Sequence, residues 1–258
     1  MAKFEAMPAG GSNGGAVVLV DGTIRRPARE NSEAVQRLLR HVRGTGFTAV
    51  PEPYGFDDEG REHVSFIAGE APQPPLPAWA GTTDTLSSIG ELVAGFRQAT
   101  ATFVPRPTER WFASPAIPTE FAAHGCVGHN DIDFGNIIFE DHLPIGLIDF
   151  DYAAPSDPVW DLAVAAFYLV PLRDPATIDE RLRGQSSLER IAALTAAAAL
   201  PRAEASRLVD TVVAFHHHRR DRAVLAGRAT AAWLHQHELD SAWLDGSVSS
   251  LRARVARS

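Results

Sequence analysis

Cysteine and lysine are almost absent from this chain of 258 residues, which contains one of each, Cys126 and Lys3. A single cysteine excludes an internal disulfide. The opening stretch MAKFEAMPAGGSNGG has no apolar core long enough for a secretory signal, so we expect a cytoplasmic protein. The longest apolar run, at 162–172, is shorter than the roughly 20 residues that cross a bilayer. It predicts a buried helix, and we expect no membrane partner.

Positive charge is also in deficit, because 24 Lys and Arg residues stand against 32 Asp and Glu residues, for a net charge of −8. The basic residues form no cluster that could neutralise a run of phosphates, so no nucleic-acid partner is expected. With 45% hydrophobic residues, the chain can bury a sizeable core as one large domain or as two unequal lobes.

The first 67 residues predict a small sheet with one helix. AVVLV, then Asp21-Gly22, then TIRR predict a hairpin with a tight turn. Apolar residues at helical spacing follow, with Asn31 and Ser32 as candidate N-caps and a stop at 44–46. The segment 52–67 predicts two further strands around DDEG.

The remaining residues, 68–258, predict a larger and mainly helical unit. The proline-rich segment 68–81 is interpreted as a linker, which places the boundary near Ala68. Helices are expected at about 84–103 and 157–170. A long helical region is expected from about 176 to 239, with interruptions at Gly184, Pro201 and Gly227. The predicted fold class is therefore α+β, with a small lobe at 1–67 and a large lobe at 68–258.

The stretch VGHNDIDFGNIIFEDHLPIGLIDFD, 127–151, contains five aspartates among apolar residues. NIIF and GLIDF predict a hairpin, and a turn centred between His142 and Leu143 would place Asn136 opposite Asp149. Cross-strand partners have Cβ atoms about 4.5–5.5 Å apart, so an amide oxygen and a carboxylate would converge, which suits Mg²⁺. Asp131, in the preceding loop, would lie close to that ion and could accept a hydroxyl proton.

His129-x-Asp131, with Asn136 five residues later and then Asp149, resembles the catalytic and metal-binding loops of the aminoglycoside phosphotransferase family, relatives of protein kinases. The resemblance implies a bilobal protein-kinase-like fold and transfer of phosphate from ATP or GTP, with Mg²⁺, to a hydroxyl of a small molecule. It implies that Asp131 is the catalytic base and that Asn136 and Asp149 hold the metal. His129 would support the loop by hydrogen bonding.

Two further segments carry the resemblance. SFIAGE, 65–70, is similar to the hinge of the family and makes Phe66 and Ile67 candidate nucleotide-binding residues. SDPVWDLA, 156–163, follows the metal-binding strand as it does in the family. Within it Asp161 is a lone charge in an apolar helix and must find hydrogen-bond donors, so we expect it to bond the backbone of the catalytic loop as a structural support.

The chain departs from the family pattern on the side of the nucleotide phosphates. The family usually presents a lysine there, and we expect Arg25 to replace it, with Arg26 as the alternative because neighbouring strand residues face opposite sides. The acidic partner of this basic residue is expected on the following helix. Glu33 is available there, but Val35 lies nearer the expected register. No complete phosphate-binding glycine motif is present, and GGSNGG at 10–15 is interpreted as a flexible terminus.

Several interpretations stay open. A nucleotide-binding but inactive relative and a metal-dependent hydrolase are the alternatives to a kinase. The acceptor could be an aminoglycoside, a macrolide, an amino alcohol or a sugar, since fold does not set substrate. Asp133 and Asp151 match no essential family position, although Asp151 could assist the metal through water. FHHHRR at 215–220 is expected to be a solvated helix face, because consecutive helical residues point about 100° apart.

Overall fold

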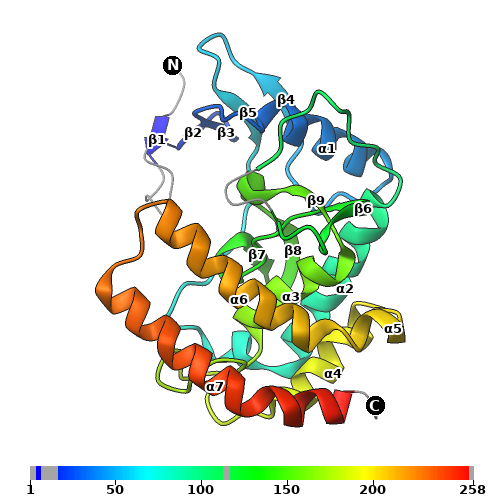
Figure 1. Ribbon diagram of the computed structural model, residues 1–258. Coiled ribbons are helices and arrows are strands. Elements are labelled where there is room, and N and C mark those ends of the chain that lie inside the picture. Colours follow the sequence, from blue (N-terminus) through cyan, green and yellow to red (C-terminus); the bar gives the residue numbers. More distant parts are fainter. Residues whose placement is uncertain (1–3, 7–16, 113–116, 256–258) are drawn as a thin grey trace.

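The computed structural model describes residues 4–6, 17–112 and 117–255. In this part of the chain a five-stranded antiparallel sheet, in the order β1-β2-β3-β5-β4, lies at one end of the molecule, and the helices α3 to α7 lie at the other (Figure 1). The strands of this sheet are β1 Phe4–Ala6, β2 Val18–Val20, β3 Thr23–Arg26, β4 Pro53–Phe56 and β5 Glu62–Ser65.

The predicted hairpins of this sheet are confirmed. β2 and β3 are joined by Asp21 and Gly22, whose φ angles of 49° and 75° are the left-handed values that a two-residue turn of this kind requires. β4 and β5 pair around DDEG. GGSNGG, 10–15, lies outside the described residues. β5, the last strand of this sheet in chain order, ends at Ser65, and the lobe boundary near Ala68 stays a prediction.

The helix α1, Ser32–Gly44, packs its apolar face against β4 and the helix α2. Asn31 occupies the predicted N-cap position, but its side chain makes no cap hydrogen bond. Its amide instead donates to the backbone oxygen of Asp151, 2.9 Å away. A local capping rule therefore located the helix start, while a distant segment uses the capping side chain.

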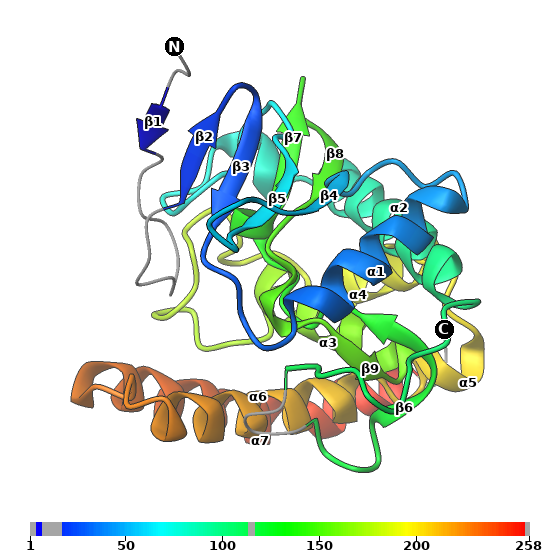
Figure 2. The same ribbon diagram turned by 90° about the horizontal axis from the view of Figure 1, so that it is seen from above.

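The rest of the described chain consists of six further helices and two small two-stranded sheets. Figure 2 shows α6 and α7 running side by side along the face that lies away from the five-stranded sheet. The helices are α2 Thr83–Thr100, α3 Pro158–Leu169, α4 Ser187–Ala197, α5 Arg202–Ala205, α6 Leu208–Leu225 and α7 Ala231–Val255. The sheets pair β6 Ala122–Gly128 with β9 Ala154–Ser156, and β7 Ile137–Glu140 with β8 Leu143–Leu147.

The predicted long helical region differs from the observed one at both ends. Segment 176–186 is not helical, because the carboxylates of Asp174 and Asp179 accept hydrogen bonds from nearby backbone N–H groups and favour turns. α7 continues past 239 to Val255, where Leu244 and Leu251 are buried in the core. Tertiary burial therefore extends a helix whose sequence signal fades.

The apolar helix α3 is the centre of the larger region, and almost all its residues are buried. It packs against α6 and β6, next to the catalytic loop. The linker is tied to the hairpin by two backbone hydrogen bonds of 2.8 Å between Glu70 and Phe139. Among the described residues, no helix is long and apolar enough to span a membrane.

Candidate active site

The hairpin β7–β8 forms where the sequence predicts it, but its register differs from the prediction by one residue. Ile137 pairs with Leu147, and the N–H of Ile148 donates to the oxygen of Asn136 at 2.9 Å. Asn136 therefore lies opposite Ile148 and not opposite Asp149. The turn is centred between Asp141 and His142, which both have positive φ angles, so Glu140 pairs with Leu143 and the pairing begins two residues away from the predicted one. A register shift between Ile138 and Phe139 then reduces the difference to one residue.

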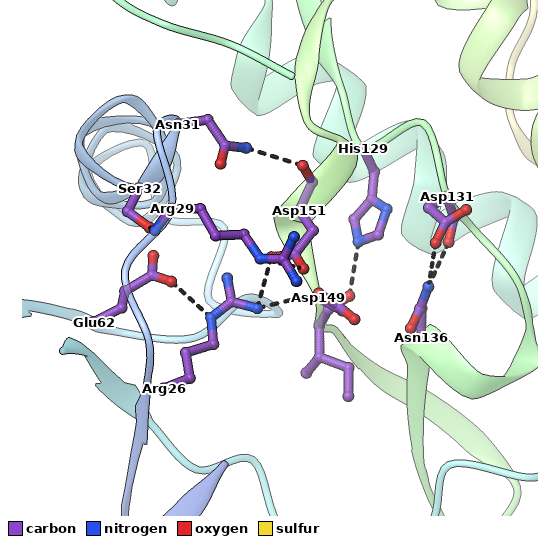
Figure 3. A network of polar contacts seen from close by, with 11 residues as sticks. Arg26, Arg29, Asn31, Ser32, Glu62, His129, Asp131, Asn136, Asp149 and Asp151 are labelled. Atoms are coloured by element: carbon purple, nitrogen blue, oxygen red, sulfur yellow. Dashed lines mark hydrogen bonds and ion pairs between the residues drawn. The ribbon is translucent and has the colours of Figure 1, made fainter. Parts of the chain in front are cut away.

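Asp131 and Asn136 are brought together directly. The amide nitrogen of Asn136 donates to the backbone oxygen of Asp131 at 2.7 Å and to its carboxylate at 3.2 Å (Figure 3). Asp133 accepts a hydrogen bond from the N–H of Asn136 and begins the single turn between them. Because the amide nitrogen is engaged by Asp131, the amide oxygen of Asn136 is left for another partner.

Asp161, in α3, supports the segment 128–136, which is called the catalytic loop after its proposed role. Its carboxylate accepts hydrogen bonds from the backbone N–H groups of His129, at 3.1 Å, and Asn130, at 2.7 Å. The ring Nε2 of His129 donates to the oxygen of Ile148 at 2.8 Å, which ties the loop to the end of β8. Burial lowers the pKa of His129 and raises that of Asp161. These contacts are the kind of loop support expected for both residues.

Asn130 is a positioning residue that the sequence reading did not single out. It adopts a left-handed backbone with φ of 62°, which asparagine tolerates better than most residues. Its amide donates to the oxygens of Gly128, Tyr152 and Ala154. A Cβ at Gly128 would lie 2.7 Å from Asn130 Oδ1 and 2.4 Å from Ser156 Oγ, so only glycine fits there. The signal in the sequence was GHND itself, with glycine and asparagine where backbone freedom is needed.

Asp149 lies between the five-stranded sheet and the catalytic loop (Figure 3). It has left-handed backbone angles, φ 61° and ψ 67°, which are strained for a residue with a side chain. Its carboxylate accepts a hydrogen bond from Arg26 at 3.1 Å. Strain of this size in a residue with a partly exposed carboxylate is typical of functional sites.

Arg26, and not Arg25, faces this site. Besides Asp149, its guanidinium contacts Glu62 at 2.6 Å and Asp151 at 2.9 Å. Although burial opposes the charge, the carboxylates of Glu62, Asp151 and Asp149 raise the pKa of Arg26. The alternation along β3 turns Arg25 the other way, where it contacts Asp57 at 3.5 Å. The geometry therefore favours Arg26 for the role that the sequence analysis gave to Arg25.

The acidic partner of Arg26 comes from a strand and not from the helix α1. Glu62 is fully buried and stands directly across from Arg26 in the pairing of β3 with β5. Neither Glu33 nor a residue near Val35 is involved in these ion pairs. The sequence predicted both strands, but the register that pairs Arg26 with Glu62 was not readable from it.

Burial raises the pKa of the Asp131 carboxyl to about 7, opposed by the positive charge of Arg222 and reinforced by Asp133 and Asp149. A carboxylate in such a setting holds a proton more readily than a solvated one, which suits a group that accepts a hydroxyl proton. Arg222 comes from α6, and nothing in the sequence connected that helix with Asp131.

The predicted hinge residues lie between the sheet and the hairpin. The N–H of Phe66 donates to the oxygen of Gly22, and its ring is 37% exposed. Ile67 packs over Gly146, where an added Cβ would lie 2.8 Å from its Cδ1. The exposed Phe66 is available to a ligand, while Ile67 packs against β8.

The histidine run does not form the solvated face that the sequence suggested. His216 and His218 lie about 200° apart around α6, and both are buried because His216 packs on His237 of α7 and His218 on Trp160 of α3, whereas His217 is exposed. His216 stacks on His237 with ring centroids 3.8 Å apart. In the described part of the chain no cluster of three or more His, Cys, Asp or Glu residues could hold a metal ion.

Asn136 and Asp149 nevertheless fit Mg²⁺, which takes few protein ligands and completes its shell with water and phosphate oxygens. The amide oxygen of Asn136 is left free by the contact with Asp131, and the carboxylate of Asp149 is 30% exposed. Both are hard oxygen donors. The fit to Mg²⁺ therefore rests on the type of these two oxygen donors and on their being free to bind a ligand.

Comparison with known proteins finds a phosphotransferase family over part of the chain. The Phosphotransferase enzyme family (APH) matches residues 104–200. The trifolitoxin immunity protein of Rhizobium leguminosarum bv. trifolii is 32% identical over 155 residues, which are 59% of this chain and 58% of that protein. The chain thus matches little more than half the length of this curated relative.

Solved structures cover nearly the whole chain. A microcompartment-associated aminopropanol kinase superposes with a TM-score of 0.68 at 15% identity, covering 98% of this chain and 94% of that one. The ADP-bound aminoglycoside phosphotransferase APH(2'')-Ib superposes with a TM-score of 0.61 at 12% identity, covering 96% and 94%. The chain has the protein-kinase-like fold of these small-molecule kinases. The predicted fold class and the predicted resemblance to the aminoglycoside phosphotransferase family are confirmed.

Within this kinase-like fold, the family match includes the catalytic loop and the hairpin but not β3, β5 or α6. The contacts of Arg26 with Glu62 and the approach of Arg222 to Asp131 therefore come from segments outside the matched range. They are features of this chain's own tertiary structure.

Proposed function

We propose that this chain is a nucleoside-triphosphate-dependent phosphotransferase that phosphorylates a hydroxyl group of a small molecule. The observation that carries the proposal is the direct contact of Asn136 with Asp131, beside a strained Asp149, in a kinase-like fold. ATP or GTP would be the donor, and relatives of this fold include an ADP-bound enzyme.

In this proposal Asp131 accepts the proton of the acceptor hydroxyl, whose oxygen forms a bond to the γ-phosphorus as the bond to the nucleoside diphosphate breaks. Asn136 and Asp149 would hold Mg²⁺, which when bound neutralises charge on the phosphates. Arg26 would bind phosphate oxygens, and Phe66 with Ile67 would line the nucleotide side. His129 and Asp161 keep the loop in place through the hydrogen bonds described above.

The test is release of ADP or GDP with Mg²⁺ across a panel of hydroxyl acceptors, with Asp131→Asn as the decisive variant. We expect this variant to bind nucleotide normally and to lose turnover by roughly 10²–10⁴-fold, the usual contribution of a general base. Unchanged turnover would remove Asp131 from the mechanism. Diphosphate release that needs no acceptor would support a hydrolase, and nucleotide binding without any turnover would support an inactive relative.

A second candidate function, immunity to trifolitoxin or a similar agent, is favoured by the 32% identity to the trifolitoxin immunity protein. It can be tested by expressing this chain in a sensitive bacterium and measuring survival. If protection requires Asp131, immunity is a consequence of the proposed phosphotransferase activity. Protection by Asp131→Asn at full strength would separate immunity from catalysis.

A further inference from the structure

A cavity of about 390 Å³ lies directly beside the catalytic loop. Residues 133–135 form one wall, and Tyr168 and Arg173 form part of another. Segments 72–76 and 176–182 contribute the rest of the lining. The loop wall begins two residues after Asp131, so the cavity adjoins the segment that carries this carboxylate.

The acidic groups around the cavity are already engaged by the chain itself. Asp133 accepts a hydrogen bond from the N–H of Asn136 at 3.1 Å. Asp179 accepts one from the N–H of Leu76 at 2.9 Å. Asp240 accepts one from the N–H of Asp174 and another from the hydroxyl of Thr177. These carboxylates therefore hold the walls of the cavity in place, and fewer of their oxygen lone pairs are available to bind a cationic ligand.

The arginines on the same side are not engaged in this way. Across the described ranges, the guanidinium groups of Arg173, Arg219 and Arg222 form neither a hydrogen bond nor an ion pair, and Nε of Arg173 is buried without a partner. They rest on aromatic rings instead. Arg173 and Arg219 lie 5.1 and 5.2 Å from the ring centroid of the same residue, Phe167.

Two guanidinium groups lie on one ring, and among the described residues no carboxylate forms an ion pair with either of them, so the repulsion between their charges is only partly compensated. Each guanidinium has five N–H donors that match a carboxylate or phosphate. Burial lowers the pKa of Arg173, Asp240 opposes this, and the nearby charge of Arg219 lowers it further. The pair therefore has the properties of an anion-binding site whose anion comes from outside the chain.

The position of Tyr168 connects this pair to the reacting end. Tyr168 lines the cavity, and the guanidinium of Arg219 lies 5.7 Å from its ring. Burial raises the pKa of Tyr168, the negative charges of Asp131 and Asp133 raise it further, and the positive charge of Arg219 opposes them. Arg219 and the carboxylate of Asp131 are thus both close enough to Tyr168 to influence its pKa.

We propose that the acceptor is a hydroxyl compound with an anionic group, a carboxylate or a phosphate, which Arg173 and Arg219 bind while the hydroxyl faces Asp131. This inference rests on the proposed phosphotransferase function and narrows its acceptor class. The hydroxyl proton passes to Asp131, the acceptor oxygen bonds to the γ-phosphorus, and the nucleoside diphosphate leaves. The anionic group stays unchanged and serves only for recognition.

The first experiment compares acceptors that differ only in the anion. The matched pairs are glycerate or glycerol 3-phosphate against glycerol, and serine against ethanolamine, with diphosphate release as the readout. We expect kcat/KM to be at least roughly tenfold higher for the anionic member, the scale of one charge-assisted hydrogen bond. Glycerate against glycerol 3-phosphate tells carboxylate from phosphate. Preference for glycerol and ethanolamine would overturn the proposal.

The second experiment uses Arg173→Gln and Arg219→Gln, with Arg220→Gln as the matched control because Arg220 is exposed and adjacent on the same helix. We expect the first two variants to raise KM for the anionic acceptor roughly tenfold or more and to leave KM for the nucleotide unchanged. The control should change neither. A rise in the nucleotide KM would assign the anion to the nucleotide phosphates instead and reject the proposal.

A binding measurement separates this proposal from the function on which it rests. Thermal stabilisation by glycerate and by glycerol 3-phosphate is compared between the wild type, Arg173→Gln and Arg173→Lys, without nucleotide. Stabilisation that Arg173→Gln removes and Arg173→Lys partly keeps would support the anion site even if no acceptor is phosphorylated. Turnover of ethanolamine or another cationic acceptor, with no stabilisation by either anion, would overturn the site and leave the phosphotransferase in place.

Discussion

The two sides of the catalytic loop differ in how their arginines are compensated. On the sheet side, Arg26 contacts three carboxylates of the chain, those of Glu62, Asp149 and Asp151. On the helical side, Arg173 and Arg219 lie on one aromatic ring with no carboxylate in contact, among the residues that the structure describes. The same type of side chain is therefore paired with carboxylates of the chain on one side and has no such partner on the other.

This difference has an energetic meaning. An arginine paired inside the protein is costly to remove, because its partners remain behind as buried charges. An unpaired arginine contributes little to folding, because its desolvation is not repaid until an anion binds. Four predictions test whether the two sides differ in this way.

The largest effect is expected at Asp149, where the paired side meets the proposed metal site. Asp149→Ala should remove the Mg²⁺-dependent part of the thermal shift that nucleotide produces and should lower turnover by roughly 10³-fold, since a catalytic metal supplies several kcal/mol. Asp151→Ala is the control, because it also removes a partner of Arg26 but leaves both proposed ligands. If Mg²⁺ still raises the shift fully in Asp149→Ala, the metal lies elsewhere.

The second prediction concerns stability on the paired side. Arg26→Met should destabilise the fold by about 3–5 kcal/mol, because Glu62 would stay buried without its partner. Arg25→Met should cost less than about 1 kcal/mol, since its contact with Asp57 is longer, at 3.5 Å, and Asp57 keeps Arg61 as a partner at 2.8 Å. Chemical denaturation measures both. Replacing Arg26 and Glu62 together by Met and Leu should restore stability without restoring nucleotide binding.

The third prediction concerns α6, the helix that carries Arg219 and Arg222. Burial lowers the pKa of His216 to about 3 and of His218 to about 4. The unfolded chain takes up these protons at an ordinary pKa near 6.5, so stability is full above that pH and falls as the pH drops toward 4. At pH 5 each histidine should cost up to about 2 kcal/mol.

Denaturation at pH 7 and pH 5 checks this contribution. His218→Gln should lose part of the difference between the two pH values, whereas the exposed His217→Gln should keep all of it. An equal effect of both substitutions would show that burial of the histidines does not set the acid sensitivity.

The smallest effect is expected on the unpaired side and forms the sharpest contrast with Arg26. Arg173→Met keeps an apolar contact with Phe167 and removes a buried, unpaired charge. We expect a change of less than about 1 kcal/mol, or a gain in stability, in the same denaturation assay. A loss as large as that of Arg26→Met would mean that Arg173 is compensated within the chain, and the contrast between the two sides would fail.

Much of the fold could be predicted because its signals are local. Asp21-Gly22 specified a two-residue turn, and the spacing of Val35, Leu38, Leu39 and Val42 specified a helix face. The strands β6 and β9 were not predicted, because only three residue pairs join them, across a long stretch of chain, and these leave little pattern in either segment. The end of α7 was missed since burial against other helices extends it.

The sequence by itself determined that Asp131 and Asn136 meet, because they lie five residues apart in one loop and this spacing almost fixes their contact. Only the tertiary structure decided which arginine faces Asp149, since strand alternation allows either and the pairing of β3 with β5 selects Arg26. It alone brought Arg219, from a helix far along the chain, onto Phe167 and next to Arg173. Contacts between distant segments depend on packing that no local pattern records, because the free energy that selects them is shared across the whole core.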